Sequence, residues 1–358
     1  MSDTLRQPAE ITYADEIEAL KATDDQPKPE GWELSPQAVI TYLMGGKAGG
    51  TEISAKYVGN RRLIETAVAT LATDRALLLL GVPGTAKSWV SEHLAAAISG
   101  KSTRVIQCTA GTDENQVRYS WNYAQLLAHG PSREALVPTP LFRAMEDGKL
   151  CRLEELTRMG SDVQDTLITV LSEKMLPIPE LNDAVFATRG FNVIATANDR
   201  DKGVNELSAA LKRRFNVVVL PLPDDMDEEI AIVSKRVGEM ARSLDLPAPK
   251  NVAEEVTRLL AIFRELRSGE TVDGKTTLKK PSGNLSTAEA IAVTIGGLSH
   301  AAFFNNGKLT ADSLAPNVLG AIVKDPVQDK IVLEEYLETV LKKRRDYADY
   351  YHSLTELV

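Results

Sequence analysis

The sequence has few of the residues that build disulfide scaffolds or metal clusters. Its only cysteines are Cys108 and Cys151, and its four histidines are scattered along 358 residues. The two cysteines lack CxxC spacing and no histidine cluster lies near them, which argues against a disulfide bridge or a zinc site. We therefore expect two reduced thiols in a cytoplasmic protein.

The sequence also lacks an excess of positive charge and long apolar runs. The formal net charge is −9 and the isoelectric point is near 5.2, which argues against a broad surface for duplex nucleic acid. With no helix-turn-helix or zinc signature, a DNA-processing motor is disfavoured. No apolar run approaches the roughly 18 residues that span a bilayer, and the polar, acidic residues 1–20 do not have the order of a signal peptide. We expect no membrane or nucleic-acid partner.

Short apolar segments alternate with helical patterns in the middle of the chain. They are rich in leucine or β-branched residues and span 76–82, 102–108, 149–153, 191–197 and 215–222. This alternation is typical of a buried, largely parallel sheet with crossover helices. From residue 224 the strand signals stop and helical periodicity takes over. The sequence therefore predicts an α/β domain followed by a smaller all-helical domain.

These patterns divide the chain into four parts. We expect partial disorder in the N-terminal extension, because residues 1–32 are rich in charged residues and proline and poor in large apolar groups. Within the extension, residues 34–46 predict a short helix capped by Ser35. The four parts are the N-terminal extension 1–54, the α/β domain 55–223, a helical lid 224–310 and a C-terminal helical tail 311–358.

A glycine-rich turn follows the first of the strands. Residues 81–88 read GVPGTAKS and lead into a helical pattern, which fits the phosphate-loop pattern G-x-x-x-x-G-K-[ST] except at its last glycine. Gly81 and Gly84 leave room for backbone N–H groups to converge on phosphate at the N-terminus of the helix. Lys87 would then reach the β- and γ-phosphates of ATP, and Ser88 would ligate Mg²⁺. The alternative is an ordinary Gly-Pro turn that ends in a lysine.

Acidic and amide side chains follow two other predicted strands. Glu154 and Glu155 come directly after one strand, and Asn198 ends another. In open α/β sheets, ligands bind at the carboxyl ends of the strands. One carboxylate there could hold the water shell of Mg²⁺, the next could orient an attacking water, and Asn198 could contact the γ-phosphate or that water. The alternatives are a surface acidic pair and an asparagine that caps a helix.

Two arginines, Arg213 and Arg214, lie between a predicted helix and the last strand. Such a position suits contact with a neighbouring subunit, where an arginine can neutralise the charge that develops on a γ-phosphate. The alternative is a solvated basic turn.

Taken in order, these segments resemble the MoxR-type AAA+ ATPases over about residues 55–240. The resemblance rests on YVGN (57–60) as the adenine-side segment, GVPGTAKS as the Walker A loop, the block 139–175 as Walker B, FNVIATAND (191–199) as sensor 1 and LSAALKRRF (207–215) as the arginine-finger segment. It implies an AAA+ P-loop domain followed by a helical lid. It also implies that Glu155, Asn198, Arg213 and Arg214 act in ATP hydrolysis. The implied nucleotide-binding residues are Tyr57, Val58, Gly81, Val82, Pro83, Gly84, Thr85, Ala86, Lys87, Ser88 and Trp89.

The resemblance further implies how such a protein works. Members of the family form rings, usually hexamers, and remodel partner proteins in a chaperone-like way, often partners with a von Willebrand factor A domain. No such domain fits in this chain, so the partner would be encoded separately. Residues 117–136 stand where the family inserts a hairpin, and Tyr119, Trp121 and Tyr123 alternate there as on a strand.

The sequence departs from the family pattern at three positions. Ala86 replaces a glycine, and we expect helical φ there and a small cost for its methyl group. Glu154 stands where an aspartate binds Mg²⁺, through water, and its extra methylene moves the carboxylate by about one bond length. The sensor 2 arginine is absent from its slot near Ala288. These departures leave two hypotheses, a remodelling ATPase and a nucleotide-gated scaffold with little or no turnover.

Overall fold

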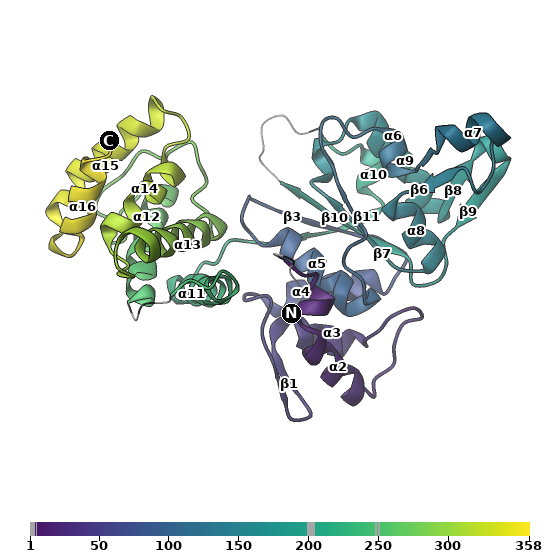
Figure 1. Ribbon diagram of the computed structural model, residues 1–358, viewed down its shortest axis with the longest axis horizontal. Helices are drawn as coiled ribbons and strands as arrows, with labels where there is room; N and C mark the ends of the chain where they lie inside the picture. Colours follow the sequence, from purple (N-terminus) through teal and green to yellow (C-terminus); the bar gives the residue numbers. More distant parts are fainter. Residues whose placement is uncertain (1–3, 5, 199–204, 248, 250) are drawn as a thin grey trace. The chain divides into compact units, whose positions relative to one another are not determined.

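The computed structural model describes residues 4, 6–198, 205–247, 249 and 251–358. It divides the chain into two compact units (Figure 1). The first comprises Met1–Val82 and Ala86–Leu220, and the second comprises Pro83–Thr85 and Pro221–Val358.

A five-stranded sheet forms the centre of the first unit. Its strand order is β11-β3-β10-β7-β4 and every neighbouring pair is parallel. The strands are β3 (Ala76–Gly81), β4 (Val105–Gln107), β7 (Leu150–Glu154), β10 (Asn192–Asn198) and β11 (Phe215–Val219). All five predicted strands are present, so the predicted α/β class is confirmed.

Helices cover both faces of this sheet. Along β3, Leu77 and Leu79 belong to one apolar cluster, whereas Ala76 and Leu78 belong to another, because successive strand residues point to opposite faces. The first cluster includes residues of α3 (Pro36–Met44), α4 (Arg61–Leu71) and α5 (Lys87–Ser99). The second includes residues of α6 (Glu114–Val117), α8 (Pro140–Asp147), α9 (Ser161–Glu173) and α10 (Ala209–Lys212).

Three small antiparallel hairpins extend the first unit. They are β1 (Gly46–Ala48) with β2 (Thr51–Ile53), β5 (Tyr119–Trp121) with β6 (Leu136–Pro138), and β8 (Met175–Ile178) with β9 (Asp183–Phe186). Tyr119 and Trp121 alternate on β5 as expected. Tyr123 differs, because Asn122 caps α7 (Tyr123–His129) and the strand ends before it.

The N-terminal segment is more ordered than its composition suggests. It carries α1 (Ala9–Thr12) and α2 (Ala14–Thr23), and α3 begins as expected after the Ser35 cap. Ile17 and Leu20 of α2 are buried in the same cluster as Leu77 and Leu79. Among residues 1–32, the expected disorder is therefore not found where the chain is described; residues 1–3 and 5 lie outside the described residues. A few well-spaced apolar side chains are enough to attach this segment.

The second unit is all-helical, as predicted. Its helices are α11 (Met226–Ser243), α12 (Val252–Ser268), α13 (Thr287–Phe304), α14 (Ala311–Ile322), α15 (Gln328–Thr339) and α16 (Ala348–Thr355). One apolar cluster runs from Val233 of α11 to Leu354 of α16. The expected lid and tail therefore share a single core, and the tail ends in two separate α-helices, α15 and α16.

Helix α13 is long and apolar enough to cross a membrane by length and composition, although no apolar run of this length was expected from the sequence. Its buried residues include Val293, Leu298 and Ala301, which belong to the apolar core of the second unit. Packing of this kind is an ordinary reason for an apolar helix.

Candidate nucleotide site

The turn between β3 and α5 is closed by the side chain of Lys87. Strand β3 ends at Gly81 and α5 begins at Lys87, so the predicted phosphate loop, residues 81–88, spans the turn between them. The Lys87 Nζ atom donates to the carbonyl oxygens of Gly81 and Val82, each at 2.9 Å. The ammonium group is thus held at the mouth of the turn, next to the N-terminus of a 13-residue helix. This is the arrangement that attracts phosphate.

The backbone at Ala86 is not what the sequence led us to expect. Its φ of 62° and ψ of 21° are left-handed, whereas we expected helical φ and a small cost. The expectation was wrong because Ala86 precedes the helix as its N-cap residue and belongs to the turn. A left-handed conformation costs a residue with a Cβ atom about 1–2 kcal/mol, so the missing glycine matters to the conformation of the loop.

Glu154 is the centre of the polar cluster at the carboxyl ends of the strands. It ends β7 and is only 3% exposed. Its Oε2 atom accepts hydrogen bonds from Ser88 Oγ at 2.6 Å and from Thr196 Oγ1 at 2.7 Å. Its Oε1 atom accepts from Arg152 Nη2 at 2.8 Å and from Ser91 Oγ. Both carboxylate oxygens are thus hydrogen-bonded, as a buried carboxylate requires.

The surroundings of Glu154 favour its charged form. Burial by itself raises the pKa of this carboxyl group. The positive charge of Arg152 and the hydrogen bonds from the nearby hydroxyl groups outweigh burial, and they hold the pKa of Glu154 below its ordinary value of 4.5. The carboxylate is therefore ionised at neutral pH.

The donor atoms at this position fit Mg²⁺. The Ser88 hydroxyl and the Glu154 carboxylate are hard oxygen donors, 2.6 Å apart, and Mg²⁺ is usually held by one or two protein oxygens together with water and phosphate. No cluster of three or more His, Cys, Asp or Glu residues suited to a metal lies among the described residues. Ser88 and Glu154 therefore suit a metal ion that binds together with a phosphate ligand.

Glu155 and Asn198 lie at the same edge of the sheet. Asn198 pairs in register with Gly81 across β10 and β3, so it stands beside the start of the phosphate loop. Glu155 follows β7 in a left-handed conformation, with φ of 58°, and its backbone N–H donates to Thr196 Oγ1 at 3.0 Å. Its half-exposed carboxylate forms an ion pair with Arg158. A partly accessible carboxylate at this edge of the sheet suits a group that orients water.

The adenine-side segment is tied to α5. Tyr57 is buried and Val58 is exposed, and the indole Nε1 of Trp89 donates to the carbonyl oxygen of Lys56 at 2.8 Å. Lys56 is itself buried, pairs with Glu16 of α2 and lies 4.4 Å from the ring centroid of Tyr13. Sequence reasoning missed Lys56 and Glu16, because nothing local links residues 40 positions apart.

The two arginines lie where the sequence placed them, after α10 and before β11. Arg213 is exposed. Arg214 donates from Nε to Ser172 Oγ at 2.7 Å and from Nη1 to the carbonyl oxygen of Ala210 at 2.6 Å. These contacts hold the guanidinium at the surface of the first unit.

Three residues around Glu154 were not predicted from the sequence: Arg152, Ser91 and Thr196. Arg152 had a recognisable signal, because an arginine inside an otherwise apolar parallel strand needs a buried partner. Ser91 lies three residues after Ser88 on α5, hence on the same face of the helix. Thr196 was noted only as part of the strand that ends at Asn198.

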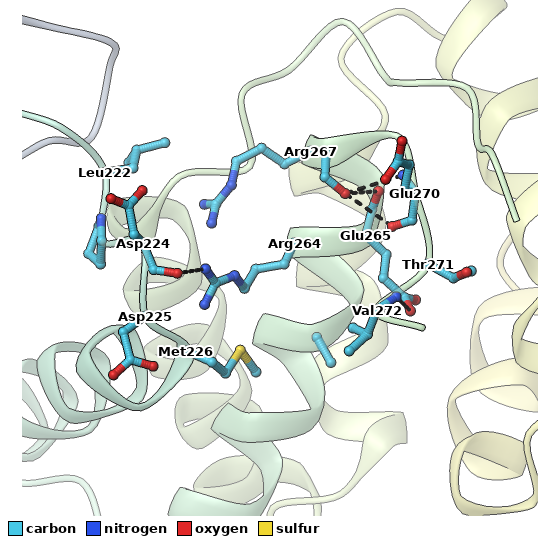
Figure 2. A pocket seen from close by; sticks show the side chains of 13 residues that line it. Leu222, Asp224, Asp225, Met226, Arg264, Glu265, Arg267, Glu270, Thr271 and Val272 are labelled. Atoms are coloured by element: carbon cyan, nitrogen blue, oxygen red, sulfur yellow. Dashed lines mark hydrogen bonds between the residues drawn. The ribbon is translucent and has the colours of Figure 1, made fainter. Parts of the chain in front are cut away.

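A separate cavity of about 740 Å³ lies within the second unit. It is lined by the residues before α11 and by the C-terminal half of α12. Figure 2 shows Arg264 extending toward Asp224, whose carbonyl oxygen it contacts. None of the predicted site residues lines it.

Comparisons with known proteins bear on both units. Residues 76–215 match the family described as AAA domain (dynein-related subfamily), and residues 227–357 match the YehL-like AAA+ ATPase C-terminal domain. The uncharacterised protein YehL of Escherichia coli (strain K12) is 42% identical over 355 residues, which cover 97% of this chain and 96% of that protein. The uncharacterised protein YojN of Bacillus subtilis (strain 168) is 29% identical over 157 residues, which cover 43% of this chain and 50% of that protein.

Among solved structures, NtrX from Brucella abortus in complex with ADP has a similar fold. The TM-score is 0.51 at 12% identity, and the match covers 83% of this chain and 61% of that chain. At this identity the likeness concerns the fold alone.

Proposed function

Because the chain belongs to the YehL-like AAA+ ATPases, we propose that it binds ATP at the turn between β3 and α5 and hydrolyses it. The observation that carries the proposal is the cluster of Ser88, Glu154 and Thr196 beside the Lys87 turn. This cluster joins the start of α5 to the carboxyl ends of β7 and β10, which supports a site for phosphate and a metal at this edge of the sheet.

The proposed division of work follows from these positions. Backbone N–H groups of the turn and the N-terminus of α5 would bind the phosphates, and Lys87 would add its positive charge. Ser88 and Glu154 would hold Mg²⁺, which would supply positive charge to the phosphate oxygens. Tyr57, Val58 and Trp89 would lie on the adenine side.

In the hydrolytic step, water attacks the γ-phosphorus and the bond from that phosphorus to the β–γ bridging oxygen breaks. Glu155 would orient the water and accept its proton, and Asn198 would hold the water or a γ-phosphate oxygen. ADP leaves with the electron pair of the broken bond. This assigns the acid–base work to the half-exposed carboxylate of Glu155 and leaves the buried Glu154 ionised.

We further propose a MoxR-type mode of action. In it the subunits form a ring, with six as the expected number, and Arg214 or Arg213 reaches the nucleotide of the adjacent subunit. Turnover would be coupled to remodelling of a separate partner protein, with a von Willebrand factor A domain as the expected recognition module. The support is the ordered set of motifs and the surface position of both arginines.

A nucleotide-gated scaffold is the second candidate. It is favoured by Glu154 in place of aspartate and by the absence of an arginine at the slot near Ala288. Such a protein would bind ATP and change its assembly state without appreciable turnover.

ATPase assays on Glu155→Gln separate the two. We expect the wild type to hydrolyse ATP, Glu155→Gln to bind it with similar affinity and lose about 10²-fold or more in rate, and the exposed-site control Glu173→Gln to match the wild type. Equal background rates for wild type and Glu155→Gln, with intact nucleotide binding, would favour the scaffold. Absence of nucleotide binding by the wild type would exclude both.

A further inference from the structure

A buried arginine stands two residues before Glu154 on the same strand. Arg152 is 7% exposed and Glu154 is 3% exposed, and both side chains leave the same face of β7 because they are two positions apart. Strands in the middle of a parallel sheet are covered on both faces and usually carry apolar residues. An arginine kept there needs a partner, and its partner is the carboxylate expected to act at the metal.

The hydrogen bonds divide the two oxygens of that carboxylate between two groups. Oε1 accepts from Arg152 Nη2 at 2.8 Å and from Ser91 Oγ. Oε2 accepts from Ser88 Oγ at 2.6 Å and from Thr196 Oγ1 at 2.7 Å. Only the Oε2 side therefore faces the serine of the phosphate loop.

The guanidinium that holds Oε1 is itself fixed. Arg152 Nη1 donates to the carbonyl oxygen of Ser102 at 3.1 Å, Nη2 donates to that of Ser88 at 3.1 Å, and Nε donates to Ser91 Oγ at 2.9 Å. The group thus bridges β7 to the first turns of α5, which is the helix that follows the phosphate loop.

We propose that Arg152 and Ser91 are positioning residues that clamp one oxygen of Glu154, so that the other oxygen is presented beside Ser88. This rests on the proposed nucleotide site. A glutamate has one more side-chain torsion than an aspartate and reaches about 1.5 Å further. The clamp removes that extra freedom, so the longer acid does the work of the shorter one.

The clamp makes an unusual prediction about aspartate at this position. In this protein, Glu154→Asp shortens the side chain and withdraws the carboxylate from Arg152 and Ser91. Their donor groups then lose their acceptor. The residue that is usual in this motif elsewhere is therefore expected to impair this site. In a Ser91→Ala background, one of the two donors to Oε1 is already absent. Glu154→Asp then breaks fewer hydrogen bonds, and its effect should be smaller.

The test is a double-mutant cycle of Glu154→Asp and Ser91→Ala in the full chain. The readout is the affinity for a fluorescent ADP analogue, measured with Mg²⁺ and with EDTA, alongside the ATPase rate. Mg²⁺ is expected to raise the affinity of the wild type for the analogue, and we expect this increase to be about tenfold smaller in each single variant. The affinity measured in EDTA should change little. The double variant should lose much less than the product of the two.

Arg152→Lys and Arg152→Met supply a second measurement. Lysine keeps the charge and is expected to retain part of the Mg²⁺-dependent gain, whereas methionine is expected to abolish it. Circular dichroism and the thermal midpoint report whether each variant is folded, and the Ser91 cycle stands by itself if Arg152→Met fails to fold.

The outcomes separate this inference from the function on which it rests. Multiplicative losses in the cycle, improved binding in Glu154→Asp, or equal losses with Mg²⁺ and with EDTA would overturn the clamp while leaving nucleotide binding in place. A wild type that binds no nucleotide would overturn the proposed function, and the clamp with it.

Discussion

The guanidinium of Arg152 lies 2.8 Å from Glu154, measured from Nη2 to Oε1, and both side chains are buried on the same face of β7. Together with the hydrogen bonds from the nearby hydroxyl groups, this ion pair favours the charged form of the acid nearest to Ser88. Its energetic consequence is that neither partner is easily removed, because the other would be left as an uncompensated buried charge.

Stability should therefore depend on pH through Glu154. Its pKa is depressed below 4.5 in the folded protein, so its contribution is present above that pH and is lost as the pH falls through the lower folded value. We expect the difference in the free energy of unfolding between wild type and Glu154→Gln to be largest near neutral pH and to shrink below pH 4.5.

Urea unfolding followed by tryptophan fluorescence measures this difference, because Trp32, Trp89 and Trp121 all belong to the first unit. Glu173→Gln, at an exposed glutamate, is the control. A difference that does not change between pH 7 and pH 3 would contradict the assignment.

The left-handed conformation of Ala86 predicts that glycine there stabilises the protein. Ala86→Gly relieves about 1–2 kcal/mol of strain and gives back about 0.4–1 kcal/mol through the greater freedom of the unfolded chain. We expect a net gain of about 0.5–1 kcal/mol in the free energy of unfolding. The matched control is Ala69→Gly on the exposed side of α4, which should cost about 1 kcal/mol. If both variants lost stability equally, Ala86 would have ordinary helical φ.

The ion pair between Glu16 and Lys56 predicts that the N-terminal segment contributes to stability. The Lys56 side chain is 1% exposed and that of Glu16 is 17% exposed. Glu16→Gln leaves a buried ammonium group without its carboxylate, and we expect a loss of about 3 kcal/mol. Glu18→Gln, whose side chain is 70% exposed, should change stability by less than about 0.5 kcal/mol. Similar small losses of stability in Glu16→Gln and Glu18→Gln would show that the buried charge of Lys56 does not need its ion pair with α2.

If Arg214 acts on the nucleotide of a neighbouring subunit, its loss should affect turnover and not binding. We expect Arg214→Ala to abolish ATPase activity with nearly unchanged nucleotide affinity. Ser172→Ala is the matched control, because it removes one of the two local hydrogen-bond partners of Arg214 and keeps the guanidinium. Normal hydrolysis by Arg214→Ala would move the role to Arg213, and loss of activity in Ser172→Ala would point to a local structural role.

Both thiols should be unreactive in the folded protein. Burial, together with the charges of Glu154 and Glu155, raises the pKa of Cys108 to about 12, and burial raises the pKa of Cys151 as well. Since only the thiolate reacts, we expect no labelling by a thiol-specific disulfide reagent at pH 8 and labelling of both residues in urea. Rapid labelling of the native protein would show that this part of the sheet opens readily.

Much of the fold follows from local sequence patterns. The five strands, the Ser35 cap and the change to an all-helical second unit were predicted correctly, because apolar periodicity and capping are properties of neighbouring residues. The AAA+ family was also predicted correctly. The MoxR type, the ring and the partner stay predictions.

The order of the N-terminal segment was harder to predict. Residues 1–32 have the composition of a disordered tail, but Ile17 and Leu20 are buried and Glu16 binds Ser54 and Lys56. Composition averages over the few side chains that make these contacts.

The sequence by itself determined that a glycine-rich turn with Lys87 and Ser88 follows a buried strand, and that acids end another strand, because these features are contiguous. Only the tertiary structure decided how the two carboxylate oxygens of Glu154 are hydrogen-bonded. One oxygen accepts from Ser88, 66 positions away, and the other accepts from Arg152 and Ser91. The tertiary structure also decided that Ala86 is left-handed. Contacts between distant residues and the φ of a turn residue depend on how the sheet and α5 pack, and no short stretch of sequence encodes that packing.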